Sequence, residues 1–409
     1  MERHYGMDWL RIGAFALLIF YHIGMVFVPW PFQVKTAHPL IWTEIPMFLT
    51  SPWRLTLLFV VSGYASRALI ARSPGVGAFL RRRSGRLLWP LLFGMAVIVP
   101  PQTWIEVTTQ HGYAHGFGYF WLHDYFRFGT MFGIVMPTWN HLWFVVYLWV
   151  YTAALSLALL LPGAGRAQEV FDRAFAGWRA LVVPALYFVL LEAVLFHRAE
   201  DTHDLLHDGI AHLRYLPAFL FGFGLGGSPA VMAGLARHWK PAAAAAIGCY
   251  ATLAALLIVH PDFSFTSDGS VWLYRLVRHG ETWTAIAALI GIAETHWNRD
   301  NRWRPMLVEA VFPFYIIHQT IIVLVGGALL ARPVPQLAEF AILVVTTVAG
   351  CWAFYLAGRK VAWLRPFIGL RTVAKPAASA KRIGHDGNER LDAAGPRWSW
   401  HNRAREDCA

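Results

Sequence analysis

The stretch DWLRIGAFALLIFYH, residues 8–22, opens a hydrophobic run that reaches about Val28 and is long enough to cross a bilayer as one helix. Two ionisable residues, Arg11 and His22, lie inside this run. On a helix they fall within about 20° of one face and about 16 Å apart along the axis. Polar groups at such depth face a partner or a water-filled cavity, which predicts a functional site. The alternative is that Arg11 marks the helix end and His22 hydrogen-bonds a neighbouring helix.

The composition is typical of an integral membrane protein. The chain has 409 residues, of which 57% are hydrophobic and 14% charged, against about 25% charged in a typical soluble domain. The net charge of +11 suggests nucleic acid binding, but most basic residues lie beside hydrophobic segments, where they set topology. The cysteines, at 249, 351 and 408, show no spacing typical of a disulfide framework or a thiolate metal site. We therefore expect an all-α, polytopic protein that contacts the lipid bilayer and no nucleic acid.

Ten hydrophobic segments are long enough to be membrane spans. They cover approximately residues 8–28, 53–71, 87–104, 141–161, 179–197, 212–227, 241–260, 276–294, 306–330 and 337–358.

The density of lysine and arginine alternates between the connecting loops. The loops after the second, fourth, sixth, eighth and tenth spans are basic, whereas residues 197–211 and 261–271 are acidic. The richest basic loop carries five arginines between residues 72 and 86. The positive-inside rule therefore places both termini in the cytoplasm.

The chain divides into a long membrane domain and a short tail. Residues 1–370 form the transmembrane domain in this interpretation. Residues 371–409 mix Pro, Gly, Ala and charged residues with little apolar periodicity, which predicts a disordered, basic cytoplasmic tail. No internal repeat is evident, which argues mildly against transporters built from duplicated halves. No small-residue cleavage site follows the first apolar run, so we expect an uncleaved first helix.

Two predicted outward segments contain candidate binding residues. Residues 105–140 are rich in aromatic rings, which could stack on sugars but are more often interfacial belt residues. Two pairs of histidines, His111 with His115 and His203 with His207, have the i, i+4 spacing that could place two imidazoles on one helical face. A catalytic zinc site needs a third ligand and an activating carboxylate. We expect no bound metal, and Asp204 and Asp208 beside the second pair leave a metal site as the alternative.

Four strings along the chain carry one resemblance. They are Arg11 followed by ten residues and His22, LFVVSGY at residues 58–64, RxxRLxxP at residues 83–90, and YIIHQ at residues 315–319. In this order they resemble the signatures of the membrane-bound acyltransferase 3 family, the integral-membrane O-acyltransferases. The paired phenylalanines usual before the Ser-Gly string are reduced here to Leu-Phe. The resemblance extends from about residue 3 to residue 370.

A fifth string favours one branch of the family. HLWFVVYLWVY, residues 141–151, is similar to the fourth-helix string of the branch of glucan biosynthesis protein C, whose members are associated with succinyl substitution of periplasmic glucans. The resemblance implies a multi-pass protein of the bacterial inner membrane. It implies an acyl-CoA donor, succinyl-CoA or acetyl-CoA, an extracytoplasmic glycan acceptor such as a periplasmic glucan, and no permanently bound cofactor.

Acyl transfer from a thioester to a sugar hydroxyl needs a base, two positioned substrates and a stabilised oxyanion. His22 suits the base because a neutral imidazole accepts a proton near pH 7, or it could carry the acyl group itself. Arg11 would orient the donor, with Asp8 as a plausible ion-pair partner, or would merely anchor the helix. The order of residues in the family's basic string assigns Arg83 and Arg86 to the phosphates of coenzyme A.

The family strings imply roles for five further residues. His318 would be a third catalytic residue, although a lone buried histidine more often hydrogen-bonds between helices. His141, at an outward helix start, would approach the acceptor, and Ser62, Tyr315 and Gln319 would also bind substrate.

Two rival functions belong to other classes. One is a small-anion transporter with a polar path lined by Arg11, His22 and His318. The other is a metal-dependent membrane hydrolase that uses the outward histidines. The missing repeat and the clustered cytoplasmic arginines favour the acyltransferase.

Overall fold

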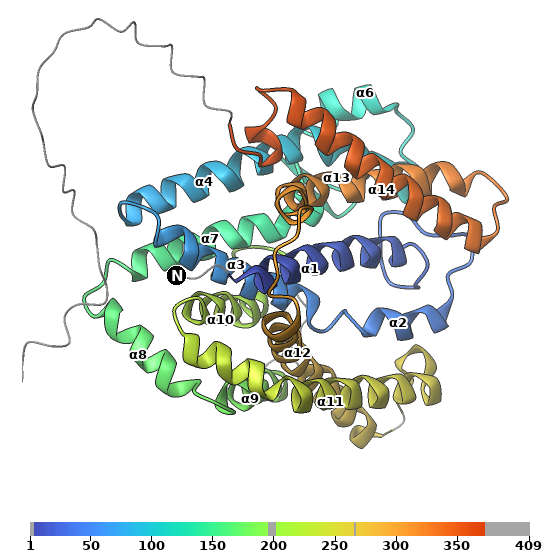
Figure 1. Ribbon diagram of the computed structural model, residues 1–409. Coiled ribbons are helices and arrows are strands. Elements are labelled where there is room, and N and C mark those ends of the chain that lie inside the picture. Colours follow the sequence, from blue (N-terminus) through green and yellow to red (C-terminus); the bar gives the residue numbers. More distant parts are fainter. Residues whose placement is uncertain (1–3, 195–201, 266, 373–409) are drawn as a thin grey trace, which may run out of the picture.

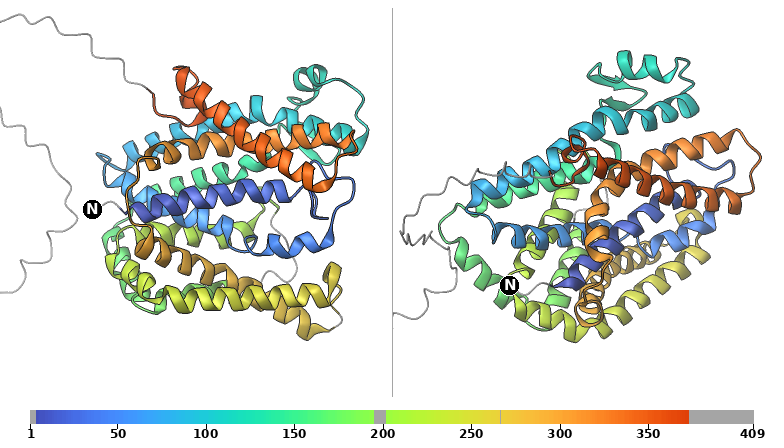
Figure 2. Two further views of the ribbon diagram at one scale, coloured as in Figure 1. Left: turned by 45° about the vertical axis from the view of Figure 1, so that its right-hand side comes forward. Right: turned by 45° about the horizontal axis from the view of Figure 1, so that its top comes forward.

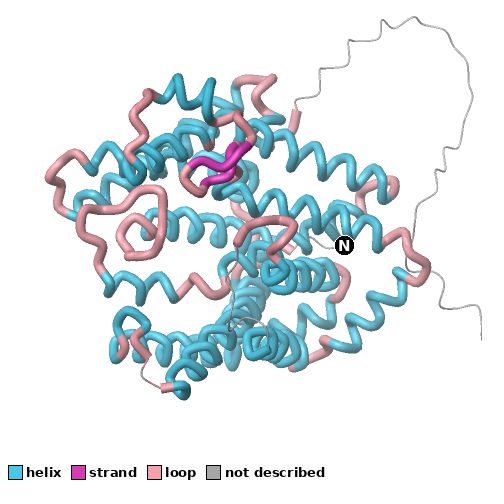
Figure 3. The backbone as a smooth tube through the Cα atoms, turned by 180° about the vertical axis from the view of Figure 1, so that it is seen from behind, coloured by secondary structure: helices cyan, strands magenta, loops and turns pink. Residues whose placement is uncertain are grey.

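The computed structural model describes residues 4–194, 202–265 and 267–372, and most of these residues are helical (Figures 1 and 3). Within them the one sheet is a short antiparallel hairpin of β1 (Gly129–Met131) and β2 (Ile134–Met136), in which Thr130 lies opposite Val135. The predicted all-α fold class is confirmed. The predicted tail lies almost wholly outside the described residues, which end at residue 372.

The helices follow one another along the chain, and the longest connections are those between α1 and α2 and between α6 and α7. They are α1 Tyr5–Gly24, α2 Glu44–Phe48, α3 Arg54–Ile70, α4 Val76–Phe93, α5 Pro100–His111, α6 Phe117–Tyr119, α7 Trp143–Ala158, α8 Ala164–Ala174, α9 Arg179–Val194, α10 Gly209–Leu225, α11 Pro229–Val259, α12 Asp268–His296, α13 Arg304–Leu330 and α14 Gln336–Lys360.

Six helical stretches of the described residues are long and apolar enough to cross a membrane. They are α1, the continuous run from α4 to α5, the stretch that contains α7, and α11, α13 and α14. The pair α8 and α9, bent by 93°, could supply a seventh. The protein is therefore a multi-pass membrane protein. Helices α3, α10 and α12 occupy three further predicted spans, but α3 and α10 have only 17 residues each, so the count of ten spans stays a prediction.

The basic segment after α3 differs from the expected loop. α4 begins at Val76, so the arginines at positions 81–86 lie on its first turns. The helix then continues through a π-helical stretch, Gly94–Ile98, into α5. Arginine is a good helix former, and its long side chain can extend from a helix to water. A helix, not a loop, therefore presents these charges.

Helix α1 lies inside the bundle, with α13 and α14 on one side and α12 on the other (Figures 1 and 2). Its start is fixed by polar contacts with the α12–α13 region. His4 Nδ1 lies 3.0 Å from Glu294 Oε2, and the Arg304 guanidinium pairs with Asp8. Because α1 is one unbroken helix, these contacts also set the position of His22 near its other end.

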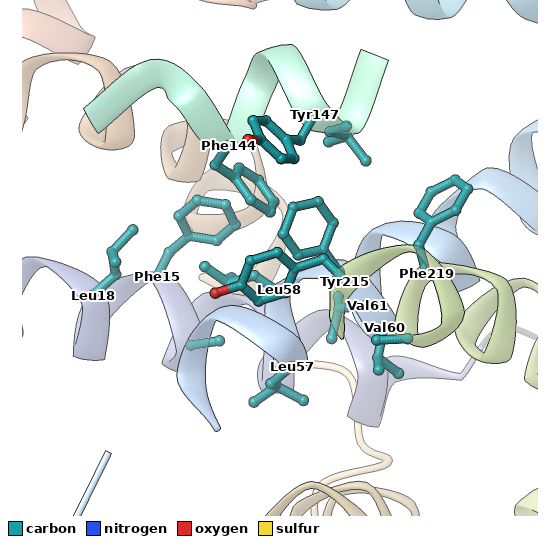
Figure 4. Close-up of a cluster of buried hydrophobic side chains, with 14 of the residues drawn as sticks. Phe15, Leu18, Leu57, Leu58, Val60, Val61, Phe144, Tyr147, Tyr215 and Phe219 are labelled. Carbon is teal, nitrogen blue, oxygen red and sulfur yellow. The ribbon is translucent and has the colours of Figure 1, made fainter. Parts of the chain in front are cut away.

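A cluster of aromatic and aliphatic side chains joins α1 to α3, α7 and α10 (Figure 4). The ring of Phe59 on α3 is stacked on Tyr215 of α10 at 4.8 Å between centroids, and it lies 4.6 Å from the ring of Phe144 on α7. Phe15 and Leu18 of α1 complete the cluster. The predicted signature helix is thus packed at the centre of the core.

Two glycines allow α3 and α10 to touch. A Cβ atom at Gly63 would collide with the Phe219 carbonyl, and one at Gly222 would collide with the Val60 carbonyl. Small residues at such contacts let membrane helices approach closely. The Ser-Gly string of the second predicted span therefore has a packing function.

Candidate active site

A chamber of about 1220 Å³ opens beside the C-terminal end of α1. Its walls come from residues 25–35, from the starts of α3 and α7, from the end of α5, from α13 and from residues 202–204. The walls formed by these helix ends lie on the predicted extracytoplasmic side. Both predicted outward segments contribute to the walls, the second of them through residues 202–204. His22 lies on this chamber wall.

Aromatic rings form much of the wall. They are those of Tyr21, Trp30, Phe32, Trp139, Trp143, Phe144 and Tyr315. Phe32 is stacked with His22 at 6.3 Å between centroids, and Trp143 is stacked on His203 at 4.2 Å. Flat apolar faces beside convergent polar groups are typical of a site for a small organic ligand.

The aromatic residues of segment 105–140 divide into two groups. Tyr125 donates its hydroxyl hydrogen bond to backbone carbonyls, at 2.9 Å to Met95 O, and Trp121 Nε1 donates to Ala96 O at 2.8 Å. These rings hold the segment against the π-helical stretch between α4 and α5. Trp139 instead lines the chamber and is the ring in this segment best placed to stack on a sugar.

Three histidines from separate segments converge at the chamber wall, where His22 and His141 line the chamber and His318 lies against them. The ring centroid of His318, on α13, lies 5.0 Å from that of His22 and 5.2 Å from that of His141. His141 lies in the 3-10 turn Asn140–Leu142 that precedes α7. The structure thus brings together the three histidines that the sequence singled out from distant strings.

Hydrogen bonds assign the protons of this group. His318 Nδ1 lies 2.7 Å from Tyr315 O, and because a carbonyl only accepts, Nδ1 carries the hydrogen. In neutral His318, Nε2 therefore accepts, and His22 Nδ1 donates to it at 3.1 Å and to Leu18 O at 3.0 Å. The other ring nitrogen of His22, Nε2, keeps its lone pair and can take a proton.

The predicted substrate residues on α13 and before α7 also lie on the chamber wall. His141 Nε2 donates to Ile316 O at 3.0 Å, and the Tyr315 hydroxyl donates to His141 O. Within the described residues, His141 Nδ1 and Gln319 Oε1 are buried without a hydrogen-bond partner. Such unpaired buried atoms are rare in native proteins and each requires an explanation, such as a bound ligand.

Ser62 lies elsewhere. Its backbone carbonyl accepts the hydrogen bond of the Ser66 hydroxyl at 2.8 Å, and it is not among the residues that line the chamber. The neighbouring Gly63 faces α10. The structure does not bring Ser62 to His22.

At the other end of α1, Arg11 lies near the arginines of α4. The charges of Arg83 and Arg86 act on each other and on Arg11, and that of Arg371, beyond α14, acts on Arg86. Arg83 Nε is buried without a hydrogen-bond partner in the described part of the chain. Positive charges held close together attract an anion, and a guanidinium group binds phosphate through two parallel hydrogen bonds. We name Arg11, Arg83, Arg86 and Arg371 the arginine cluster.

Two further cations on the chamber wall were missed in the sequence. Arg54 begins α3, and Lys35 lies in the segment after α1. Lys35 Nζ donates to Met25 O at 2.6 Å and to Val28 O, and burial lowers the pKa of Lys35 to about 8. A signal was present, because both are basic residues on the predicted outward side, where lysine and arginine are scarce.

The outward histidines make local contacts. His207 Nδ1 lies 2.7 Å from Asp204 Oδ2, and this hydrogen bond lowers the pKa of the Asp204 carboxyl. Asp208 caps α10 by accepting from Ala211 N at 3.0 Å. Across residues 4–194, 202–265 and 267–372, no group of three or more His, Cys, Asp or Glu side chains could hold a metal ion.

Comparisons with known proteins point to one family. A family model described as an acyltransferase domain matches residues 4–356. The glucans biosynthesis protein C of Escherichia coli O6:K15:H31 (strain 536 / UPEC) and that of Escherichia coli O1:K1 / APEC are each 27% identical over 151 residues. The match spans 37% of this chain and 37% of the length of each relative. No solved structure is significantly similar.

Proposed function

The chain belongs to the membrane-bound acyltransferase 3 family, whose acyltransferase domain matches residues 4–356, and we propose that it moves an acyl group from acyl-CoA to a hydroxyl of an extracytoplasmic glycan. One observation carries the proposal: α1 has a histidine with a free lone pair on a large chamber at one end and the arginine cluster at the other. The name of the relatives, glucans biosynthesis protein C, favours a glucan as the acceptor.

The arginine cluster is the proposed site of the donor's phosphates. Coenzyme A is an anion supplied by the cytoplasm, and the cluster lies at the helix ends that the positive-inside rule assigns to that side. Arg83 Nε, buried and unpaired in the described part of the chain, is available to a phosphate oxygen. With the phosphates held there, the pantetheine arm would extend along α1 and bring the thioester to His22.

His22 would act as the general base. Its Nε2 takes the proton of the sugar hydroxyl as the hydroxyl oxygen attacks the thioester carbonyl carbon. The tetrahedral intermediate then collapses, the carbon–sulfur bond breaks, and the departing sulfur takes the proton back from His22. The products are the glycan ester and free CoA. Transfer through an acyl-imidazole at the same nitrogen would use the same geometry in two steps.

His318 would position this base. Nε2 of His318 accepts the hydrogen of His22 Nδ1. This hydrogen bond fixes the His22 ring and leaves Nε2 of His22 facing away from α13. A second residue that orients a base in this way is typical of enzymes that activate a hydroxyl. The acceptor would occupy the chamber between Trp139 and the walls that carry His141 and Gln319.

We further propose that the protein acts in the bacterial inner membrane, because this location gives one enzyme access to cytoplasmic acyl-CoA and to a periplasmic glycan.

Transfer across the membrane can be tested in sealed inside-out vesicles with unlabelled glucan enclosed in the lumen and radiolabelled acyl-CoA outside. Label on the enclosed glucan is expected, and vesicles carrying His22→Ala serve as the control. Label that appears only on glucan added outside would contradict transfer across the membrane. CoA release without an ion gradient separates this function from anion transport.

A further inference from the structure

Arg54 carries a buried guanidinium on the chamber wall. The residue is 7% exposed and lines the chamber. Its Cζ lies 3.1 Å from the ring centroid of Tyr21, and Nη1 lies 3.5 Å from Ser51 O, the limit of a hydrogen bond. Its Nε is buried without a hydrogen-bond partner, and no ion pair joins Arg54 to an acid within residues 4–194, 202–265 and 267–372. Burying an arginine in this state is unfavourable unless an anion completes it.

This guanidinium lies next to the proposed base. Tyr21 is the residue before His22, and their ring centroids are 6.1 Å apart. Arg54 Cζ lies 3.1 Å from the same Tyr21 centroid. The distance from Arg54 Cζ to the centroid of the His22 ring therefore cannot exceed the sum of these two distances. The charge of Arg54 also acts directly on His22. Arg54 thus belongs to the inner wall of the chamber and not to its rim.

The separation suits a short acyl chain with a terminal carboxylate. The two carbonyl carbons of a succinyl group are about 4 Å apart, since three carbon–carbon bonds of about 1.5 Å join them. A hydrogen bond of about 2.9 Å from the guanidinium to the terminal carboxylate and an approach of about 3–3.5 Å between the sugar hydroxyl and the reacting carbon make this path longer than the upper limit, so the acyl chain would bend between Arg54 and His22. An acetyl group would leave Arg54 unpaired.

We propose that Arg54 is the residue that selects the acyl group, by pairing with the terminal carboxylate of a dicarboxylic acyl chain attached through its other end to CoA. The inference rests on the proposed acyl transfer and adds the residue that recognises the transferred group. The donor's thioester reaches His22 from the side of the arginine cluster, so its acyl chain projects past His22 into the chamber.

Two donors of equal carbon number isolate the carboxylate. Succinyl-CoA ends in a carboxylate and butyryl-CoA ends in a methyl group. For the purified protein with a glucan acceptor, we expect kcat/KM to favour succinyl-CoA by about 30-fold or more, the effect of a buried charge pair of about 2 kcal/mol. Arg54→Met should abolish this preference by lowering only the succinyl rate, and Arg54→Lys should restore part of it. A purely structural role would lower both rates equally.

Arg278→Met is the matched control. Arg278 lines a small neighbouring cavity, with its guanidinium 5.9 Å from the ring centroid of Tyr274, and is absent from the chamber wall. Its loss should leave the ratio of the two rates unchanged. The ratio, not the absolute activity, is the readout, because any general destabilisation cancels from it.

The binding of both donors can be measured by calorimetry without an acceptor. This measurement tests the role of Arg54 whichever acceptor the enzyme uses. Tighter binding of succinyl-CoA that disappears in Arg54→Met supports Arg54 as the selecting residue, even if no glucan is acylated and the proposed function fails. Equal binding and equal transfer of the two donors by the wild type would overturn the inference and leave acyl transfer standing. A preference that survives in Arg54→Met would also overturn it.

Discussion

His318 Nε2 lies 3.1 Å from His22 Nδ1, and this contact joins α13 to α1 at the chamber wall. Since Tyr315 O fixes the hydrogen of His318 on Nδ1, the contact also fixes the tautomer of His22. Two residues 296 positions apart in the sequence thus determine together which nitrogen faces the chamber.

Replacing His318 should lower turnover without weakening donor binding. His318→Met removes the side-chain acceptor of His22 Nδ1 and leaves only Leu18 O to hold the ring, so we expect kcat to fall by about 100-fold with the donor KM unchanged. His318→Gln offers a side-chain oxygen in nearly the same place and should retain a larger share of the activity. Steady-state kinetics of CoA release provide the measurement. Equal losses in both variants would show that His318 only fills space.

The arginine cluster should control the affinity for the donor's phosphates. We expect Arg83→Met to raise the donor KM by roughly 10-fold with little change in kcat, since a hydrogen bond to a charged group contributes about 1.5–3 kcal/mol. Arg82→Met is the control, because Arg82 directly precedes Arg83 on the same helix and is exposed. An acyl-pantetheine donor, which lacks the nucleotide, should be used equally by both variants. A loss of the same size in Arg82→Met would contradict a specific phosphate site.

The contact between α3 and α10 should not tolerate a side chain at Gly63. Gly63→Ala places a methyl group against the Phe219 carbonyl, and we expect a loss of about 1–3 kcal/mol in unfolding free energy. Gly85→Ala on α4 meets open space and should be neutral or stabilising by about 0.5–1 kcal/mol. Unfolding of the two variants in detergent, followed by circular dichroism, gives the comparison. A stable Gly63→Ala protein would mean that the two helices do not pack this closely.

Lys35 should give the enzyme a pH dependence near 8. Burial lowers its pKa from 10.5 to about 8, so the ammonium is charged below pH 8 and loses its charge above it. The charge attracts anionic ligands into the chamber and strengthens the hydrogen bonds to Met25 and Val28. We therefore expect kcat/KM for an anionic donor to fall as pH rises through 8, and Lys35→Met to lack this fall. Blanks without enzyme correct for alkaline thioester hydrolysis. An identical fall in Lys35→Met would assign it to another group.

The sequence predicts the membrane class and much of the site because the deciding features are local. Apolar runs and the alternation of basic loops place the helices, and the spacing of Arg11 and His22 follows from helix geometry. The convergence of His141 and His318 on His22 could be expected only through the family strings, because it depends on how α7 and α13 pack around α1.

Other features depend on tertiary structure and escaped the sequence interpretation. The role of Gly63 appears only where α10 meets α3, and the position of Ser62 away from the chamber appears only once the helices are packed. Arg54 stands out in the sequence only as a basic residue on the predicted outward side, and its burial beside Tyr21 is a feature of the tertiary structure. The helix that replaces the predicted basic loop shows how weakly composition alone separates a charged loop from a charged helix.

The role of His22 as the base is tested most directly by the release of free CoA from detergent-purified protein offered acyl-CoA and a glucan acceptor, with wild type and His22→Ala compared side by side. We expect turnover by the wild type and its loss, by about 100-fold or more, in the variant, with donor binding retained. Turnover that survives in a folded His22→Ala protein would contradict the assignment of the chemistry to His22.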